Sequence, residues 1–292
     1  MFKSGFVNII GNPNVGKSTL MNAMVGEKLS IVSAKAQTTR HRIMGIVNGE
    51  DYQIVYSDTP GILKPSYRLQ QDMVDFVDTA IGDADIILYV TDTVEKSDKN
   101  IEYVEKLPRL TCPVIIVINK IDISDQEKVK ELMAYWKEKV PNAIIIPASA
   151  SEKFGLENIL DTVKANLPEC PPWFDKDAFT DKNLRFFAAE IIREKILLNY
   201  KEEIPYCCQV EVESFKEGSE RYDISAVIHV MRESQKGIVI GKKGAALKKV
   251  GTAARIEMED FFQKKVFLEL FVKVTPDWRE DKKQLRRFGY EI

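Results

Sequence analysis

The stretch "GNPNVGKST" at Gly11–Thr19 constrains the fold of this chain more than any other feature. It matches the pattern G-x-x-x-x-G-K-[ST] and stands between the apolar run "FVNII" and a helix-like segment over residues 18–25. Gly11 and Gly16 allow the backbone to curl so that its amides point at phosphate oxygens, reinforced by the positive end of the next helix. The sequence therefore predicts a strand, a phosphate-binding loop and a helix in direct succession.

The remainder of the first half alternates apolar runs with amphipathic segments. The runs "YQIVYS", "DIILYV", "PVIIVIN" and "AIIIPA" read as further strands. Helices are expected over residues 18–25, 69–81, 100–107, 126–139 and 156–167. This alternation favours an α/β unit with a mostly parallel sheet.

With 292 residues the chain is long enough for two domains. The segment "LPECPPWFDKDAFTDKN" ends the first pattern and reads as a stiff connector because it is rich in proline. After it we expect a helix at 184–198, strands near 206–215 and 222–231, a helix pair around 241–262 and the strand "KVFLELFVKV". The expected division is residues 1–168, a linker at 169–183, and a smaller α+β domain at 184–292.

The stretch "NKID" at Asn119–Asp122 follows an apolar strand and points to the base of a nucleotide. The carboxylate of Asp122 can accept from the N1–H and the exocyclic amine of guanine together, a donor pair that adenine lacks. Asn119 is expected to steady the loop, and Lys120 to pack along the ring. With "SA" at Ser149–Ala150, the pattern indicates GTP and GDP as ligands.

A magnesium site is expected beside the phosphates. The Ser18 hydroxyl would bind Mg²⁺, and Asp58 of the stretch "DTPGI" would hold the ion through water. Between these two positions, the polar segment "AKAQTTRHR" offers the hydroxyls of Thr38 and Thr39. One of them should close over the metal when GTP is bound, as switch segments do.

Hydrolysis is expected to be slow. Lys17 would reach the β- and γ-phosphates and the Gly61 amide would sense the γ-phosphate, but Ile62 stands where Ras-like GTPases carry the glutamine that orients water. Asn14 has two interpretations. The form "PNVGKS" resembles GTPases that bind K⁺ beside the phosphates, and Asn14 could equally be a turn residue in a bent loop.

The second half carries a basic segment. Gln235–Arg255 contains six Lys or Arg and no Asp or Glu, although the whole chain has a net charge of −2. Its centre, "GKKG" at Gly241–Gly244, matches the G-x-x-G loop of KH domains, between the apolar "IVI" and a helical segment. The expected RNA-binding residues are Lys236, Ile238, Ile240, Gly241, Lys242, Lys243, Gly244, Lys248, Lys249 and Arg255.

Other functions find little support in the composition. No apolar run is long enough for a membrane span, the N-terminal residues do not resemble a signal peptide, and four cysteines with two histidines show no zinc-ligand spacing. We therefore expect a cytoplasmic protein.

The chain as a whole resembles the Era family of bacterial ribosome-assembly GTPases. The resemblance rests on "GNPNVGKSTLMN", "KAQTTRHRIMGI", "DTPGI", "NKID", "AAEIIREK", "ESQKGIVIGKKG" and "LELFVKV". It implies a Ras-like P-loop GTPase domain followed by a type II KH domain, with Thr39 rather than Thr38 on Mg²⁺. It also implies a monomer that binds the 3′ end of 16S ribosomal RNA during 30S maturation, with possible peripheral contact with the cytoplasmic membrane.

On this resemblance, Lys17, Gly61, Thr39 and Asn14 are the expected catalytic residues. The expected nucleotide-binding residues are Gly11, Asn12, Pro13, Asn14, Val15, Gly16, Lys17, Ser18, Thr19, Asp58, Thr59, Pro60, Gly61, Ile62, Asn119, Lys120, Asp122, Ser149 and Ala150. Two other hypotheses stay open at this point. The chain could be a constitutive RNA-binding protein with a structural nucleotide, or a membrane-associated GTPase whose small domain docks a protein.

Overall fold

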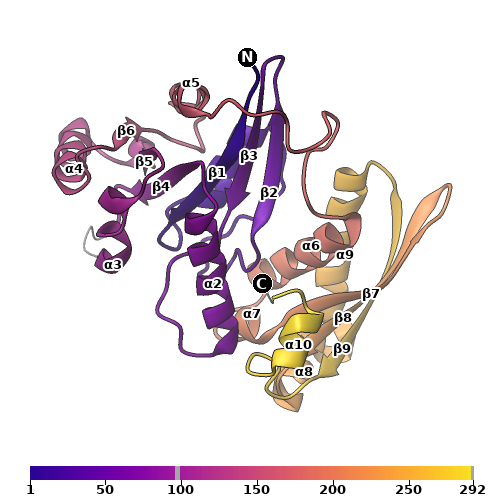
Figure 1. Cartoon of the computed structure of the whole chain (residues 1–292). Helices are drawn as coiled ribbons and strands as arrows, with labels where there is room; N and C mark the ends of the chain where they lie inside the picture. Colours follow the sequence, from indigo (N-terminus) through magenta and orange to yellow (C-terminus); the bar gives the residue numbers. More distant parts are fainter. Residues whose placement is uncertain (96–98, 291–292) are drawn as a thin grey trace. The chain divides into compact units, whose positions relative to one another are not determined.

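The computed structural model describes residues 1–95 and 99–290, which form two compact units (Figure 1). The first unit comprises residues 1–66 and 70–181. The second comprises residues 67–69 and the chain from Lys182 onward.

The first unit is built on a six-stranded sheet in the order β2-β3-β1-β4-β5-β6. The strands are β1 (Lys3–Gly11), β2 (Ile43–Asn48), β3 (Tyr52–Asp58), β4 (Ile86–Asp92), β5 (Val114–Asn119) and β6 (Ile144–Pro147). All neighbours pair in parallel except β2 and β3, which pair antiparallel. The predicted α/β unit with a mostly parallel sheet is confirmed.

Strand β2 was not expected from the sequence. Its residues, "IMGIVN", include a central glycine and follow a long polar loop, so they carry little strand signal. The strand forms because its backbone pairs with β3 from Ile43 opposite Asp58 to Asn48 opposite Gln53. It therefore lies at the sheet edge next to the strand that ends in Asp58.

The helices of the first unit largely follow the sequence pattern. They are α1 (Lys17–Val25), α2 (Arg68–Gly82), α3 (Ile101–Val104), α4 (Gln126–Lys139) and α5 (Leu156–Asn166). The helix expected over 100–107 is shorter, because Pro108 has no amide to donate and the segment continues as a 3₁₀ turn at Leu107–Arg109. No helix in the described ranges is long and apolar enough to cross a membrane.

The segment expected as a connector, 169–183, packs along the first unit as far as Asp181. The Gln53 side chain accepts from the amides of Trp173 and Phe174 at 2.8 and 3.0 Å and donates to the Phe174 carbonyl at 2.8 Å. The Phe179 carbonyl accepts from the Ile46 amide at 2.9 Å. The segment is therefore tied to β2 and β3 by backbone hydrogen bonds.

The second unit has helices on a three-stranded sheet in the order β7-β8-β9. Its elements are α6 (Leu184–Asn199), α7 (Ile204–Cys207), β7 (Gln209–Glu217), β8 (Arg221–Val230), α8 (Glu233–Ile240), α9 (Ala245–Phe262), β9 (Lys265–Val274) and α10 (Lys282–Arg287). Strand β8 pairs antiparallel with β7 and parallel with β9. Residues of α6, α9 and the sheet share one apolar core.

The helix pair begins earlier than predicted. The sequence placed it around 241–262, whereas its first helix is α8 and starts at Glu233. The two helices meet at the "GKKG" corner, where Gly241 and Gly244 have φ of 72° and 78°. Lys243 also has a positive φ, at 53°. The glycines allow this corner because left-handed backbone carries no side-chain penalty for them.

Candidate nucleotide site and nucleic-acid groove

A hollow of about 330 Å³ lies beside the phosphate loop at the carboxyl ends of the parallel strands. This edge of an open α/β sheet is where ligands bind, because the loops after the strands converge there. Most of its lining was expected from the sequence, but the segment 31–35 was not. The lining residues are Pro13, Asn14, Gly16, Lys17, Ser18, Thr19, Ile31, Val32, Ser33, Ala34, Lys35, Gln37, Thr38, Thr39, Gly61 and Lys120.

Lys17 is buried at the base of this hollow. Its Nζ donates to the carbonyls of Gly11 and Asn12 at 3.1 and 2.8 Å. Burial lowers the pKa of Lys17 to about 8, an effect that the charges of Asp58 and Glu95 partly offset. The ammonium is thus held inside the loop curve where phosphate oxygens would enter.

Three oxygens converge at the expected metal position. The Ser18 hydroxyl lies 2.6 Å from Asp58 Oδ2 and 2.8 Å from Thr39 Oγ1, and Thr39 Oγ1 lies 3.3 Å from the same carboxylate oxygen. Asp58 is fully buried, and its Oδ1 has no hydrogen-bond partner in the described part of the chain. Burial raises the pKa of Asp58, and its hydrogen bond with Ser18 opposes the rise.

These oxygens fit Mg²⁺. A hard cation takes carboxylate and hydroxyl oxygens and keeps several waters, so the unpaired Asp58 Oδ1 suits an ion held through water. Thr38 does not join the cluster, since its hydroxyl donates to the Lys35 carbonyl at 2.6 Å. Of the two threonines that the sequence offered, Thr39 is the one beside Ser18.

The turn after Asp58 packs tightly against the phosphate loop. A Cβ on Gly61 would lie 2.8 Å from the backbone of Pro13, so only glycine fits there. The next residue, Ile62, has a side chain that is 1% exposed and belongs to an apolar cluster with Ile10 and Val77. Ile62 therefore anchors the turn in the core and does not line the hollow.

The backbone of Ile62 is fixed on both sides. Its amide donates to the Gly11 carbonyl at 3.1 Å, and its carbonyl accepts from Asn100 Nδ2 at 2.9 Å. Asn100 Nδ2 also donates to Asn12 Oδ1 at 2.7 Å, and Asn12 Nδ2 donates to Glu95 at 2.7 Å. The turn is thus connected through side chains to the loop after β4, which sequence reasoning did not include in the site.

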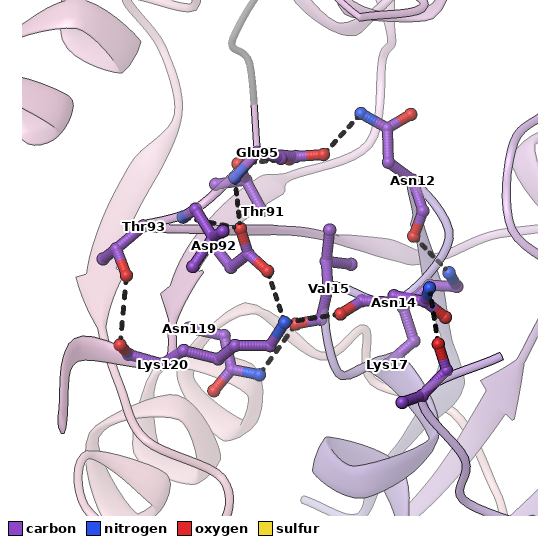
Figure 2. A network of polar contacts seen from close by, with 12 residues as sticks. Asn12, Asn14, Val15, Lys17, Thr91, Asp92, Thr93, Glu95, Asn119 and Lys120 are labelled. Carbon is purple, nitrogen blue, oxygen red and sulfur yellow. Dashed lines mark hydrogen bonds and ion pairs between the residues drawn. The ribbon is translucent and has the colours of Figure 1, made fainter. Parts of the chain in front are cut away.

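Figure 2 shows that the loop after β4 holds a second group of contacts. Asp92 Oδ2 lies 2.5 Å from the Lys120 ammonium, which also donates to the Asn14 carbonyl at 2.6 Å. Asn14 in turn donates through its side chain to the Ala34 carbonyl at 3.0 Å. Lys120 therefore ties its own loop to the phosphate loop, and Asn14 ties that loop to the segment that lines the hollow.

Asn119 joins three loops through one side chain. Its Nδ2 donates to the Val15 carbonyl at 2.9 Å, and its Oδ1 accepts from the Ala150 amide at 3.0 Å. Gly16 has a φ of 96°, and a Cβ there would lie 2.2 Å from Asn119 Nδ2. Gly16 is therefore required both by its backbone conformation and by the space that Asn119 occupies.

Asp122 is exposed, and Ser149 orients it. The Ser149 hydroxyl donates to Asp122 Oδ1 at 2.5 Å, which fixes the carboxylate at the edge of the loop. Such a carboxylate can accept the paired N–H groups of a guanine base.

A separate hollow of about 340 Å³ lies in the second unit, beside the "GKKG" corner and between α9 and β9. Its lining includes the predicted Gly244, Lys248 and Arg255, and the unpredicted Leu247, Gly251, Thr252, Leu268 and Leu270. Ile238 and Ile240, expected to form an apolar groove, lie on α8, and Ile238 is half exposed. The apolar lining therefore comes from α9 and β9, which meet only in the folded unit.

The basic side chains around this groove lie in solvent. Lys242, Lys243, Lys248 and Lys249 are exposed, whereas Arg255 pairs with Glu259 at 2.8 Å. Exposed lysines beside two glycines allow a phosphate backbone to approach closely, which is what a nucleic-acid groove of this kind requires.

Two family models match the chain. One, described as a 50S ribosome-binding GTPase, matches residues 6–120, and a KH domain model matches residues 203–279. The order helix, two strands, two helices and strand in the second unit is the type II arrangement. The predicted P-loop GTPase fold followed by a KH domain is confirmed.

Full-length relatives are similar along the whole chain. "GTPase Era" of Geobacter metallireducens is 47% identical over 292 residues, covering 99% of this chain and 98% of that protein. "GTPase Era" of Clostridium kluyveri is 43% identical over 293 residues and covers 100% of both.

Solved structures give the same result. The crystal structure of Era in complex with MgGDPNP and nucleotides 1506–1542 of 16S ribosomal RNA matches with a TM-score of 0.95 and 41% identity, covering 100% of both chains. An Aquifex aeolicus Era variant bound to GDP·AlF4⁻ matches with the same TM-score, identity and coverage.

Replacing Ile62 with glutamine should destabilise the first unit rather than accelerate hydrolysis. The new amide would be buried in an apolar cluster at a cost of about 2–4 kcal/mol. Ile62→Val, which keeps the apolar contact, should cost about 1 kcal/mol. Urea unfolding and single-turnover GTP hydrolysis of both variants check this. A stable Ile62→Gln protein with faster hydrolysis would contradict the buried position.

Nucleotide affinity should fall at alkaline pH because of Lys17. In the free protein its pKa is about 8, and bound phosphates raise it, so binding above that pH must take up a proton. Affinity should be level below pKa and then weaken by up to about tenfold per pH unit. Titration with a fluorescent GDP between about pH 7 and 9 measures this. Lys17→Arg does not titrate there, so its curve reports the nucleotide's own titration, and matching slopes would contradict the assignment.

Asp122→Asn should weaken GTP binding by about 100-fold or more, because the amide cannot accept two donors as the carboxylate does. Xanthosine triphosphate, which offers an acceptor in place of the amine, should bind better to the variant. Competition against a fluorescent GDP measures both affinities. Unchanged guanine preference would show that the base lies elsewhere.

Proposed function

Because the chain belongs to the Era family of GTPases, we propose that it is a GTP-driven switch that binds the 3′ region of 16S ribosomal RNA and acts in maturation of the 30S subunit. The single observation that supports this most strongly is the match along the whole chain to an Era–RNA complex. The GTPase model description names the 50S subunit, but it covers only residues 6–120 and so does not include the KH unit.

The nucleotide is bound by the phosphate loop and the loops that Asn119 joins. Lys17 meets the β- and γ-phosphates, and Asp122 reads the guanine base. Ser18 and Thr39 hold Mg²⁺ directly and Asp58 holds it through water; the bound ion neutralises phosphate charge. The Gly61 amide contacts the γ-phosphate, and the wedge against Pro13 sets its direction.

Hydrolysis relies on positioning and charge rather than on a side-chain base. The described residues around the hollow include no glutamine after Gly61, and the Ile62 side chain is turned into the core. Backbone amides and the charge beside the phosphates can still catalyse phosphoryl transfer. Slow intrinsic turnover follows, and K⁺ beside Asn14 remains a prediction that KCl and NaCl buffers distinguish.

The RNA strand would occupy the groove between α9 and β9. Lys242 and Lys243 contact its phosphates, and Leu247, Leu268 and Leu270 provide an apolar floor for unstacked bases. If GTP changes RNA affinity, RNA must change GTP affinity by the same factor. A cytoplasmic, monomeric protein is part of this proposal, and peripheral membrane contact is left as a prediction.

Reversing the charge of Lys242 and Lys243 together should weaken RNA binding by about tenfold or more and reduce the salt dependence by about one ion per lost contact. Both side chains are exposed, so folding should be unaffected. They are better targets than Gly241, where any Cβ would meet Ala246 at 2.6 Å. A 16S 3′-end RNA and a scrambled RNA, titrated at several salt concentrations, measure the effect.

The matched control is Lys216→Glu, an exposed lysine on β7. It should leave RNA affinity nearly unchanged, and both proteins should bind GDP equally. Hydrolysis measured with and without RNA, in KCl and in NaCl, then tests the switch. No preference for the 16S RNA and no effect of nucleotide on RNA affinity would overturn the proposal and favour a protein-docking role for the second unit.

A further inference from the structure

Ser30 lies in the loop between α1 and the segment that lines the nucleotide hollow. Its side chain is 1% exposed, and its Oγ has no hydrogen-bond partner among the described residues. A buried hydroxyl without a partner is costly, so such a group in a folded protein calls for a reason. None of the nucleotide motifs in the sequence includes this residue.

The position of Ser30 is closely determined by Asn22. Asn22 Oδ1 accepts from the amides of Leu29 and Ser30 at 3.0 and 2.9 Å, and its Nδ2 donates to the Ser30 carbonyl at 2.7 Å. Asn22 lies one helical turn after Ser18 on α1, so the two side chains share one face of that helix. The helix that carries the expected metal ligand thus also places the backbone of Ser30.

The nearest polar group is the carboxylate of Asp58. The Ser30 hydroxyl is close enough to lower the pKa of that carboxyl, but its geometry does not make a hydrogen bond with either carboxylate oxygen. Asp58 Oδ2 is already engaged by Ser18 and Thr39. Asp58 Oδ1, which is also buried, is left without a partner. Two unsatisfied oxygens therefore stand together beside the metal position.

One hydrated cation would satisfy both oxygens. A Mg²⁺ ion keeps several of its waters, and each bound water has two hydrogens to donate. Water bound to the ion can donate to Asp58 Oδ1 and to the Ser30 hydroxyl. A direct Ser30–Asp58 hydrogen bond would need neither water nor metal, but the buried atoms are not arranged for it.

We propose that Ser30 is a positioning residue of the magnesium site, holding a metal-bound water together with Asp58. The inference rests on the magnesium site at Ser18, Thr39 and Asp58. Residues of this outer kind orient a metal's ligands, and losing one costs affinity for the metal rather than for the rest of the ligand.

The test is the affinity for Mn²⁺, used as a spectroscopic substitute for Mg²⁺, in the GDP complex. Ser30→Ala should weaken Mn²⁺ binding by about tenfold, measured by electron paramagnetic resonance. GDP affinity in EDTA should stay unchanged. Ser30→Thr, which keeps the hydroxyl, should restore Mn²⁺ affinity.

The matched control is Ser4→Ala. Ser4 is also fully buried with an unpaired hydroxyl, but it lies near the start of β1, at the opposite end of the strand from the phosphate loop. Its replacement should leave Mn²⁺ affinity unchanged. Thermal unfolding adds a second readout, since Ser30→Ala should not destabilise the metal-free protein but should reduce the stabilisation gained from Mg²⁺ and GDP.

Equal Mn²⁺ affinity in Ser30→Ala and the unmodified protein would overturn the proposal. So would equal destabilisation with and without metal, because that outcome means a purely structural role. If the unmodified protein itself binds no Mn²⁺ in the presence of GDP, the magnesium site fails, which is a different result.

Discussion

The side chain of Asn119 is the contact on which the nucleotide site depends most. It bonds to the carbonyl of Val15 and the amide of Ala150, and so holds the phosphate loop, its own loop and the loop after β6 in one arrangement. Parallel strands bring these loops to one edge of the sheet, but only roughly. Asn119 sets their spacing, and Gly16 must lack a side chain because Asn119 occupies that space.

A second constraint is the burial of Ile62. In GTPases with a glutamine at this position, the side chain belongs to the chemistry; here it belongs to the core. Its apolar contacts and the two hydrogen bonds of its backbone hold Gly61 against Pro13. The absence of a water-orienting side chain is therefore linked to a firmly anchored turn. Slow turnover and a well-defined switch position have the same physical origin.

Much of the fold and most of the nucleotide site could be predicted because the relevant signals are local. A phosphate loop, "NKID" and "DTPGI" each place their chemistry within a few consecutive residues, and buried parallel strands read as continuous apolar runs. The strand β2 and the helix α8 were missed because their sequences carry weak local signals. They form where partner elements supply hydrogen bonds and apolar contacts.

The sequence by itself determined the class of ligand, since the number and type of donors and acceptors in Asp122, Lys17 and Ser18 follow from residue identity. Only the tertiary structure decided which residues stand beside them. It selected Thr39 over Thr38, turned Ile62 into the core, and brought Ser30 to Asp58. The reason is physical: a contact between residues far apart in the chain depends on burial and packing that no local pattern encodes.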